Sequence, residues 1–484
     1  MATYNLGLVL KNDDSEYLLS KQNPPPKFGD EEYDSCVDSD LWDLPSTKLD
    51  LSEGQLSEPR IVVEGVESHV ERIDLRKFDV ESAIKRVLGQ LGLESGDWRE
   101  WRFLKLVEEA EFGPGFPVHT VYLMGKLMSG NHNLPEDCKW MSIQDCLSWL
   151  LDVTPGSDRV GPLVVAGLIN ETRKSSGQKV HTSLCYQEYP PGVVIVPMKS
   201  RTTKPFKTTN LVIFAPESIS SKCDENSFVA HGDALIVDPG CQSDSHEELF
   251  RLVAALPTKL IVFVTHHHHD HVDGLSIVQK CNPEATLLVH ENTMRRIRKG
   301  DWALGYTSVS GGEDICIGGQ RLNVIFAPGH TDGHVALHHV NTQALIVGDH
   351  CVGQGSAILD FTSGGNMADY FQSTYKFIEI QSHVLIPMHG RVNLWPRHML
   401  SGYLKNRRNR EKSILKAIEN GARTLMDIVA DVYGEVDRSL WIPASSNVRL
   451  HVEHLAEQNK LPRGFSLDPC NTSVVASADV VGKF

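Results

Sequence analysis

The stretch that decides the fold of this chain reads Ile261-Val-Phe-Val-Thr-His-His-His-His-Asp-His-Val-Asp-Gly274. Its first four residues are apolar and rich in β-branched side chains, which predicts a buried strand ending at Thr265. Imidazole nitrogens and carboxylate oxygens suit zinc, and a loop at a strand end presents them rigidly. The alternative is a solvated histidine tract set by composition, but the attached strand and the interior aspartate favour a metal loop. The candidate ligands in this loop are His266, His268, Asp270 and His271.

The whole chain has the size and composition of a multidomain protein with well-formed cores. Its 484 residues predict two to four domains, and its hydrophobic content is 41%. A net charge of −15 argues against a broadly basic surface that coats nucleic acid, although a local basic groove is compatible with it. The ten cysteines form no Cys-x-x-Cys pair, so the sequence signals neither a zinc ribbon nor a disulfide framework.

The chain carries no pattern that predicts export or membrane insertion. Residues 1–11 lack the basic segment followed by a long apolar one that a signal peptide needs. The longest apolar stretches, such as 161–169, are too short to span a bilayer. Together with reduced cysteines, this predicts a cytoplasmic protein with no membrane partner. The sequence does not decide between the cytosol and an organelle, and it carries no signal of the oligomeric state.

Local patterns divide the chain into five parts. Residues 1–152 mix short strands with a helix at 80–93 and predict an α/β or α+β domain. A connection containing Pro, Gly and Ser follows at 153–179. In residues 180–395 strands alternate with helical patterns, which predicts sheets covered by helices, with loops available for chemistry. The last two parts are a small bundle at 396–465, with helices at 400–419, 425–433 and 445–458, and a loosely held tail at 466–484.

Four further strand-like runs end in a residue that can bind a metal or orient a ligand. His330 follows Phe326-Ala-Pro-Gly, Asp349 follows Ile346-Val-Gly, and His389 follows Leu385-Ile-Pro-Met. Upstream, Asp238 follows Leu235-Ile-Val and is expected to orient a ligand through a hydrogen bond. A single His or Asp at a strand end is usually a cap. Strand after strand ending in this way is hard to explain by capping alone, so a site with two metals is predicted.

The order Thr-His-x-His-x-Asp-His, Pro-Gly-His, Gly-Asp and Pro-x-His-Gly resembles the metallo-β-lactamase superfamily. The resemblance implies an α/β fold, the αββα sandwich, with a dinuclear metal site at one edge. The ions are expected to be two zinc ions, and manganese or iron are alternatives because His/Asp sites accept them. Met388 departs from the glycine that many relatives have before the last histidine. The resemblance assigns His266, His268 and His330 to the first metal, Asp270, His271 and His389 to the second, and Asp349 to a bridging position.

The region after the site favours one of two subgroups. Residues 403–415 and the two shorter helices resemble the C-terminal winged-helix-like domain of the β-lactamase-like protein 2 family. Members of that family are endoribonucleases that act on single-stranded RNA. Thr209-Asn210 resembles the early Thr-Asn motif of that family. The glyoxalase II-like hydrolases of small thioesters share the full ligand set and are the alternative. Candidate substrate contacts are Thr209, Asn210 and the basic residues Lys405, Arg407 and Arg408, for which a solvated helix face is the alternative.

The N-terminal part resembles a Nudix domain without its metal site. The resemblance is carried by Leu41-Trp-Asp-Leu-Pro45 and by the helix around residues 83–93. A Nudix helix offers Arg-Glu-hydrophobic-x-Glu-Glu-x-Gly, whereas this chain reads Lys85-Arg-Val-Leu-Gly-Gln-Leu-Gly92 and lacks every glutamate. Without those carboxylates a magnesium–diphosphate site does not form. The domain is therefore predicted to be catalytically silent and to act as a binding or packing module.

The expected chemistry is metal-assisted hydrolysis. Two zinc ions roughly 3.5–4 Å apart would share a hydroxide, because they lower the pKa of water to about 7. Asp270 is expected to orient this hydroxide, and His334 or Thr331 to protonate the leaving group. An endoribonuclease acting on single-stranded RNA is the first interpretation and a thioester hydrolase the second. A third is a non-catalytic, metal-containing interaction protein organised around the silent Nudix-like domain.

Overall fold

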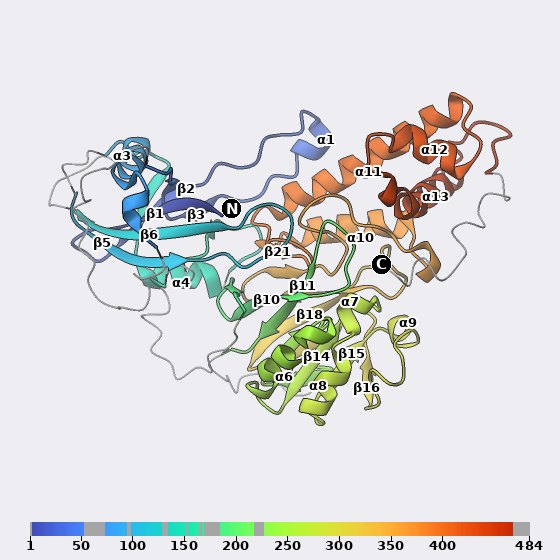
Figure 1. The fold of residues 1–484 in the computed structure, drawn as a ribbon, viewed down its shortest axis with the longest axis horizontal. Helices are drawn as coiled ribbons and strands as arrows, with labels where there is room; N and C mark the ends of the chain where they lie inside the picture. Colours follow the sequence, from blue (N-terminus) through green and yellow to red (C-terminus); the bar gives the residue numbers. More distant parts are fainter. Residues whose placement is uncertain are drawn as a thin grey trace.

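The computed structural model describes residues 2–52, 73–93, 98–127, 134–151, 153–163, 167–168, 184–216 and 227–467. The described chain forms an N-terminal sheet domain, a central sandwich of two sheets and a C-terminal group of helices (Figure 1). Most of the predicted connection at 153–179 and residues 468–484 of the predicted tail lie outside the described residues.

The first sheet of the sandwich is built around β14 (Leu260–Val264), the strand predicted from the sequence. Its side chains alternate, so that Ile261 and Phe263 pack between the two sheets while Val262 faces the covering helices. The strand order is β16-β15-β14-β13-β11-β10-β9. The strands are β9 (Gln187–Glu188), β10 (Val193–Lys199), β11 (Thr208–Phe214), β13 (Ala234–Val237), β15 (Thr286–Val289) and β16 (Tyr306–Ser308); the helices beside them are α6 (His246–Ala254), α7 (His269–Val272), α8 (Leu275–Cys281) and α9 (Glu291–Met294).

The second sheet packs its inner face on the first and its outer face on helices. Leu337 and Ile386 belong to the core between the sheets, whereas Leu345 and Leu385 pack with Phe377 on the outer side. The αββα sandwich predicted from the resemblance is thereby confirmed. The strand order is β12-β17-β18-β19-β20-β21. The elements are β12 (Ala230–Gly232), β17 (Asp314–Ile317), β18 (Gln320–Phe326), β19 (Val335–His339), β20 (Ala344–Ile346), β21 (Val384–Ile386) and the covering helix α10 (Met367–Ile380).

The N-terminal domain is an eight-stranded sheet with one main covering helix. The first strand pairs antiparallel with the second and parallel with the sixth. The helix buries Val80, Ile84 and Val87 against the sheet, at the periodicity expected from the sequence. The elements are β1 (Thr3–Lys11), β2 (Tyr17–Lys21), α1 (Glu31–Asp34), β3 (Leu41–Asp43), β4 (Ser46–Lys48), α3 (Val80–Gln90), β5 (Trp98–Val107), β6 (Val118–Leu127), β7 (Cys138–Met141), α4 (Ile143–Leu151) and β8 (Arg159–Val160).

The N-terminal domain and the sandwich share one hydrophobic core. Trp42 and Leu44 belong to the same buried cluster as Ile195 of β10 and Ile386 of β21. Arg159, within the predicted connection, is buried and donates to the carbonyl oxygens of residues 39, 383 and 394. Because β8 also pairs with β3, this part of the predicted connection is sheet rather than a free linker.

The C-terminal helices follow the sequence prediction closely. They are α11 (Pro396–Glu419), α12 (Leu425–Val432) and α13 (Trp441–Glu457). Thr424 caps α12 in a reciprocal arrangement with Asp427. The first and third helices begin about one turn earlier than predicted, and Pro396 occupies the first position of α11, where its missing N–H costs nothing.

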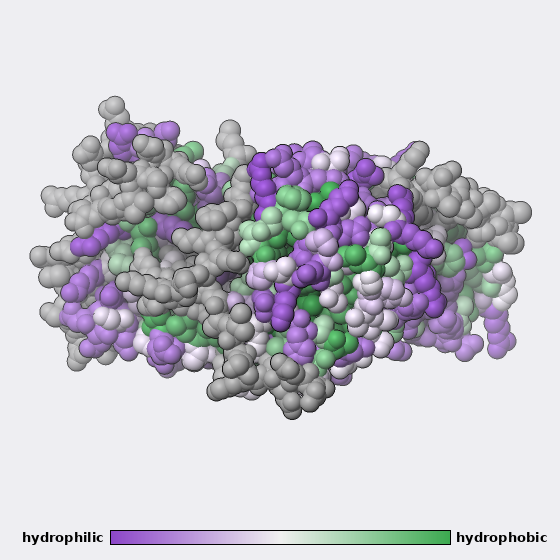
Figure 2. All heavy atoms as spheres, turned by 90° about the horizontal axis from the view of Figure 1, so that it is seen from below, coloured by the Kyte–Doolittle hydropathy of each residue, from purple (hydrophilic) through white to green (hydrophobic). Residues whose placement is uncertain are grey.

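The described surface is mixed in character. On the face that Figure 2 shows, apolar residues lie in small groups between hydrophilic ones. Among the helices that the structure describes, none combines the length and the apolar character needed to cross a bilayer.

Candidate metal centre

The predicted metal loop follows β14 and is fixed to the neighbouring strand end. Thr265 donates through its backbone N–H and its hydroxyl to the two carboxylate oxygens of Asp238, at 2.8 and 2.6 Å. Asp238 is completely buried and has a φ of +50°, an unusual value for a residue with a side chain. The end of β13 therefore sets where the loop leaves β14.

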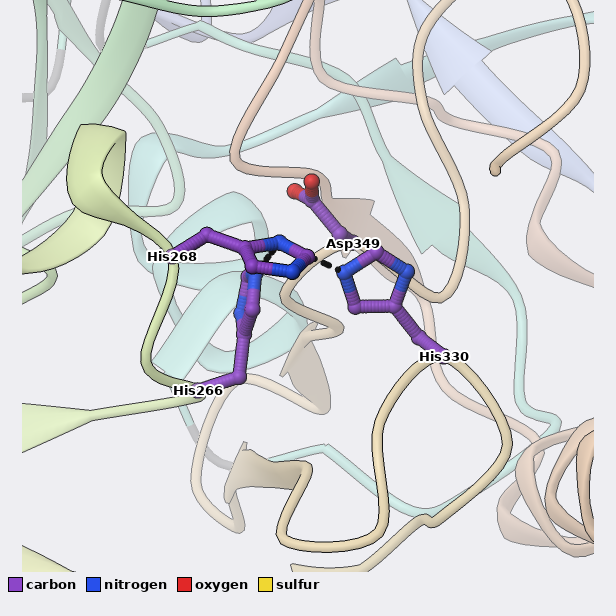
Figure 3. A group of neighbouring side chains, drawn as sticks. All are labelled: His266, His268, His330 and Asp349. Atoms are coloured by element: carbon purple, nitrogen blue, oxygen red, sulfur yellow. Dashed lines mark hydrogen bonds between the residues drawn. The ribbon is translucent and has the colours of Figure 1, made fainter. Parts of the chain in front are cut away.

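Three imidazoles converge at the first candidate metal position. The Nδ1 atom of His268 lies 3.0 Å from Nε2 of His266 and 3.2 Å from Nε2 of His330. Figure 3 shows the three rings facing one another, with Asp349 beside them. Ligands of a tetrahedral zinc ion lie about 3.3 Å apart when each metal–nitrogen bond is about 2.0 Å long. The three nitrogens and an oxygen of Asp349 all lie within 4.8 Å of one another, which fits a single cation.

The outer nitrogen of each of these rings is engaged by the protein. His266 Nδ1 lies 3.0 Å from the Thr265 hydroxyl, and His330 donates from Nδ1 to the carbonyl oxygen of Ile358 at 2.6 Å. His268 Nε2 lies 3.1 Å from a carboxylate oxygen of Asp360. Such outer contacts fix the tautomer and leave the inner nitrogens free to bind a cation.

Asp360 is a site residue that sequence reasoning missed. It lies in the loop between β20 and α10, 92 residues beyond His268 in the chain. The apolar run Ala357-Ile-Leu precedes it, just as Leu235-Ile-Val precedes Asp238, so the same pattern in the sequence could have nominated it. The sequence Asp360-Phe-Thr is a helix-capping pattern, and the Asp360 carboxylate does accept from the Thr362 N–H.

A second group of ligands meets at Asp349. Asp270 lies 3.2 Å from Nε2 of His389, and Nε2 of His271 lies 3.7 Å from the other oxygen of Asp270. One oxygen of Asp349 lies 3.5 Å from His271 Nε2 and 3.4 Å from His389 Nε2. Asp349 therefore contacts both groups, the position that the resemblance assigns to a bridging ligand. Among the described residues, His271 Nε2 and this Asp349 oxygen are buried without a hydrogen-bond partner, which leaves them available to a metal.

The second group is also held from outside. His271 contacts Asp238 through Nδ1 at 2.8 Å, and His389 donates from Nδ1 to the carbonyl oxygen of Thr208 at 2.9 Å. Asp238 thus touches both Thr265 and His271, so one buried carboxylate orients the loop and a candidate ligand.

The ionisation states of the buried side chains in the centre favour a bound cation. Burial opposes ionisation of Asp270, but His271 and His389 overcome it and lower the Asp270 pKa to about 2. Burial likewise opposes the charge on His389, yet Asp349 and Asp270 raise its pKa to about 10. Burial and the neighbouring His268 lower the pKa of His330 to about 4. The carboxylates are ionised near neutral pH, so a metal entering the second position displaces a proton from His389.

Thr209 and Asn210, predicted as substrate contacts, are buried instead. Asn210 donates from its side chain to the carbonyl oxygens of Pro387 and Gly390, at 2.8 and 2.9 Å. The Thr209 hydroxyl donates to Ser200 at 2.8 Å. Asn210 thereby holds the turn that carries His389, whereas the Thr209 hydroxyl is used on Ser200.

Replacing Asn210 with alanine is expected to destabilise the protein by about 2–3 kcal/mol, because two buried carbonyl oxygens lose their donor. Metal affinity should also fall, since the turn around His389 is no longer fixed. Urea unfolding and chelator competition measure the two effects. Asn282→Ala is the matched control: it removes a side-chain donation to the Thr258 carbonyl at 2.9 Å, away from the centre. Equal metal affinity in the two variants would contradict the expectation.

The basic residues of α11 are also used within the molecule. Arg407, predicted to contact substrate, is buried, donates to the Ala357 carbonyl oxygen and lies over the Tyr370 ring. Lys405 donates to the carbonyl oxygen of Phe28 at 2.7 Å, and Arg408 pairs with Glu411 at 3.3 Å. The run is charged in sequence, yet each of these three side chains has a partner within the molecule, and a substrate contact by any of them stays a prediction.

His334, one of the two predicted proton donors, is completely buried. Its Nδ1 donates to the carbonyl oxygen of Ala327 at 3.0 Å. Burial lowers the His334 pKa to about 3, so the ring is neutral near pH 7 and is a poor proton donor. The other candidate, Thr331, is also completely buried. His267 and His269, to which no role was assigned, contact Ser363 and Asp273.

The N-terminal domain reaches the turn that carries His389. Arg391, two residues beyond the candidate ligand, pairs with Glu109 at 2.5 Å and donates to the carbonyl oxygen of Phe116 at 3.1 Å. The ring of Phe206 lies 5.6 Å from the ring of His389. Gly113 packs against Phe206 so closely that a Cβ on Gly113 would lie 2.8 Å from the Phe206 ring. The N-terminal domain therefore contacts two residues that lie beside the candidate ligand His389, namely Phe206 and Arg391.

Comparisons with known proteins agree with this geometry. The family model described as the metallo-beta-lactamase superfamily matches residues 222–389, and the beta-lactamase associated winged helix domain matches 424–463. A Drosophila melanogaster protein named beta-lactamase-like protein 2 homolog is 30% identical over 217 residues, which cover 43% of this chain and 72% of that protein. A Caenorhabditis elegans protein of the same name is 27% identical over 198 residues, or 40% and 64%.

A third relative represents the alternative subgroup. The hydroxyacylglutathione hydrolase of Gloeobacter violaceus is 30% identical over 166 residues, which cover 34% of this chain and 58% of that protein. Both matched family models begin after residue 221. The Nudix-like interpretation of residues 1–152 therefore stays a prediction.

Proposed function

Because this chain belongs to the metallo-beta-lactamase superfamily, we propose that it is a dinuclear-metal endoribonuclease acting on single-stranded RNA. The observation that supports the dinuclear site is the position of Asp349. One of its oxygens lies 3.5 Å or less from the inner nitrogens of His271 and His389, and within the ligand range of the His266 group. A carboxylate between two sets of imidazoles is suited to join two cations.

The donor set fits a metal pair. Five imidazoles and two carboxylates, with their outer atoms engaged, are the nitrogen and oxygen ligands of zinc, and they also suit manganese or iron. When bound, two such ions lower the pKa of a water to about 7 and stabilise the charge that develops in the transition state. The candidate ligands are His266, His268, His330, Asp270, His271, His389 and Asp349.

The chain's own residues orient the attacking water and the metal ligands. Asp270 stays ionised, since its pKa lies at about 2, and its free lone pairs can orient an attacking water. Asp238 and Asp360 keep two imidazoles in fixed orientations, so little reorganisation is needed during the reaction. Because Thr331 and His334 are both completely buried, we propose solvent as the donor to the leaving group.

The choice of RNA is supported by two features. The relatives of 30% and 27% identity are named as homologs of β-lactamase-like protein 2. The resemblance of this chain to that family implies ribonuclease activity. The winged helix match at residues 424–463 adds a module of the kind that binds nucleic acid through a helix. Thioester hydrolysis is the second candidate, favoured by the similarity to a hydroxyacylglutathione hydrolase.

One experiment separates the candidates. Metal-loaded protein is incubated with labelled unstructured RNA and, separately, with S-lactoylglutathione and an acyl-CoA. We expect RNA cleavage that falls by about 10³-fold in His266→Ala, which removes a ligand at the first position. Thioester turnover without RNA cleavage would replace the proposal with the second candidate. Two bound metals with neither activity would favour a non-catalytic interaction protein.

A further inference from the structure

We propose that Asn447 and Ser446, on helix α13, are positioning residues for the metal centre. They would act through a loop at residues 357–363, the ligand-backing loop, which lies between the C-terminal helices and two candidate ligands. This inference rests on the metal centre of the proposed function. It does not depend on whether the substrate is RNA.

The ligand-backing loop touches both His268 and His330. The carbonyl oxygen of Ile358 accepts from His330 Nδ1 at 2.6 Å, and the Asp360 carboxylate lies 3.1 Å from His268 Nε2. The backbone N–H of Asp360 donates in turn to the carbonyl oxygen of His330 at 2.9 Å. Two of the three imidazoles at the first metal position are therefore oriented by consecutive parts of one loop.

Among the described residues, no strand pairs with residues 357–363, and the backbone of Leu359 is bonded to α13 instead. The Leu359 N–H donates to the side-chain oxygen of Asn447 at 2.9 Å, and the Leu359 carbonyl oxygen accepts from the Ser446 hydroxyl at 2.8 Å. Both polar groups of this completely buried residue are thus bonded to one helix. Since Leu359 stands between Ile358 and Asp360, α13 fixes the point midway between the two histidine contacts.

Further contacts bind the same loop to the C-terminal domain. Arg407 of α11 donates to the carbonyl oxygen of Ala357, at the start of the loop. Arg449 of α13 lies 3.6 Å from the centre of the Phe361 ring, near its end. Glu411 of α11 joins the two helices, because its carboxylate lies 2.6 Å from His454 of α13. The loop is held at both ends and in the middle by the C-terminal helices.

The physical consequence is a dependence of metal binding on the C-terminal domain. Removing the oxygen of Asn447 leaves the buried Leu359 N–H without an acceptor, and the loop must shift to find one. A shift moves Ile358 and Asp360 away from His330 and His268. Loss of such outer contacts lowers metal affinity by about 10–100-fold in metalloproteins.

The test is metal binding by the full chain, without reference to substrate. Wild type, Asn447→Ala and Asn447→Asp are titrated with cobalt against a chelator, and the visible spectrum of bound cobalt is recorded. We expect Asn447→Ala to bind about 10–100-fold more weakly with an altered spectrum, and Asn447→Asp, which keeps the acceptor oxygen, to recover both. Ser445→Ala is the matched control, because this buried hydroxyl donates to Ile442 within α13.

The proposal is overturned if Asn447→Ala binds cobalt as tightly as wild type with the same spectrum. It is also overturned if Ser445→Ala loses as much affinity as Asn447→Ala. Should Asn447→Ala fail to fold, Ser446→Ala removes the donor to Leu359 and decides by the same titration. Failure of the proposed function has a different signature, since it appears in the wild type as absent metal or absent RNA cleavage.

Discussion

Asp349→Ala is expected to lower the rate of hydrolysis by about 10³-fold and to reduce the bound metal from two ions to at most one. The reason is its position, with one oxygen 3.5 Å from His271 and 3.4 Å from His389 and within reach of the His266 group. Without this carboxylate, two cations repel each other with no shared negative charge between them. Metal content per chain and single-turnover cleavage measure the two effects.

The control for this variant is an aspartate outside the centre. Asp431 is exposed on the helix segment α12, and Asp431→Ala is expected to leave both metal content and rate unchanged. If Asp349→Ala keeps two ions and the wild-type rate, Asp349 is not a shared ligand and the dinuclear mechanism must be abandoned.

The second large effect is expected at Gly240, which follows the strand-end Asp238. A Cβ at this position would lie 1.9 Å from the carbonyl oxygen of Asp270 and 2.4 Å from the N–H nitrogen of His271. Both are backbone atoms, so the clash cannot be relieved by a rotamer change. We expect Gly240→Ala to lower the free energy of unfolding by about 3 kcal/mol and to weaken metal binding, because the loop carrying four candidate ligands must move.

A substitution at a second glycine is the control for this prediction. Gly89 lies within α3, and a Cβ there would meet no atom within 4 Å. Gly89→Ala should therefore stabilise the protein by about 1 kcal/mol through helix propensity alone. Thermal or urea unfolding compares the two variants. A Gly240→Ala protein as stable as wild type with unchanged metal affinity would show that the two loops are not in contact.

The metal centre was largely predictable because its ligands obey local rules. β14 is apolar and short, the candidate ligands follow the ends of strands, and the ends of neighbouring strands meet at one edge of the fold. The ordering His266, His330, Asp349 and His389 along the chain therefore becomes proximity in space. The structure brings together all seven residues that the sequence nominated for metal binding.

The surroundings of the centre were less predictable, for the opposite reason. Asp360 and Asn447 lie on a loop and a distant helix, and their contacts follow from the docking of α13, which no local pattern encodes. Arg407 sits in a run of charges that reads as a solvated face, yet its guanidinium is buried against Tyr370. Asn210 resembles a motif residue expected to contact substrate, and its partners in the structure are backbone carbonyls of a turn far along the chain.

The pairing of Glu109 with Arg391 bears on how such a chain can change during evolution. A domain joined only by a tether can be lost or exchanged while its neighbour stays intact. Here the N-terminal sheet shares a core with the sandwich through Trp42 and Ile195, and it braces the turn beside His389. Deleting it would uncover apolar surface and loosen that turn together, so loss of this domain is expected to be disfavoured wherever the candidate metal centre is required.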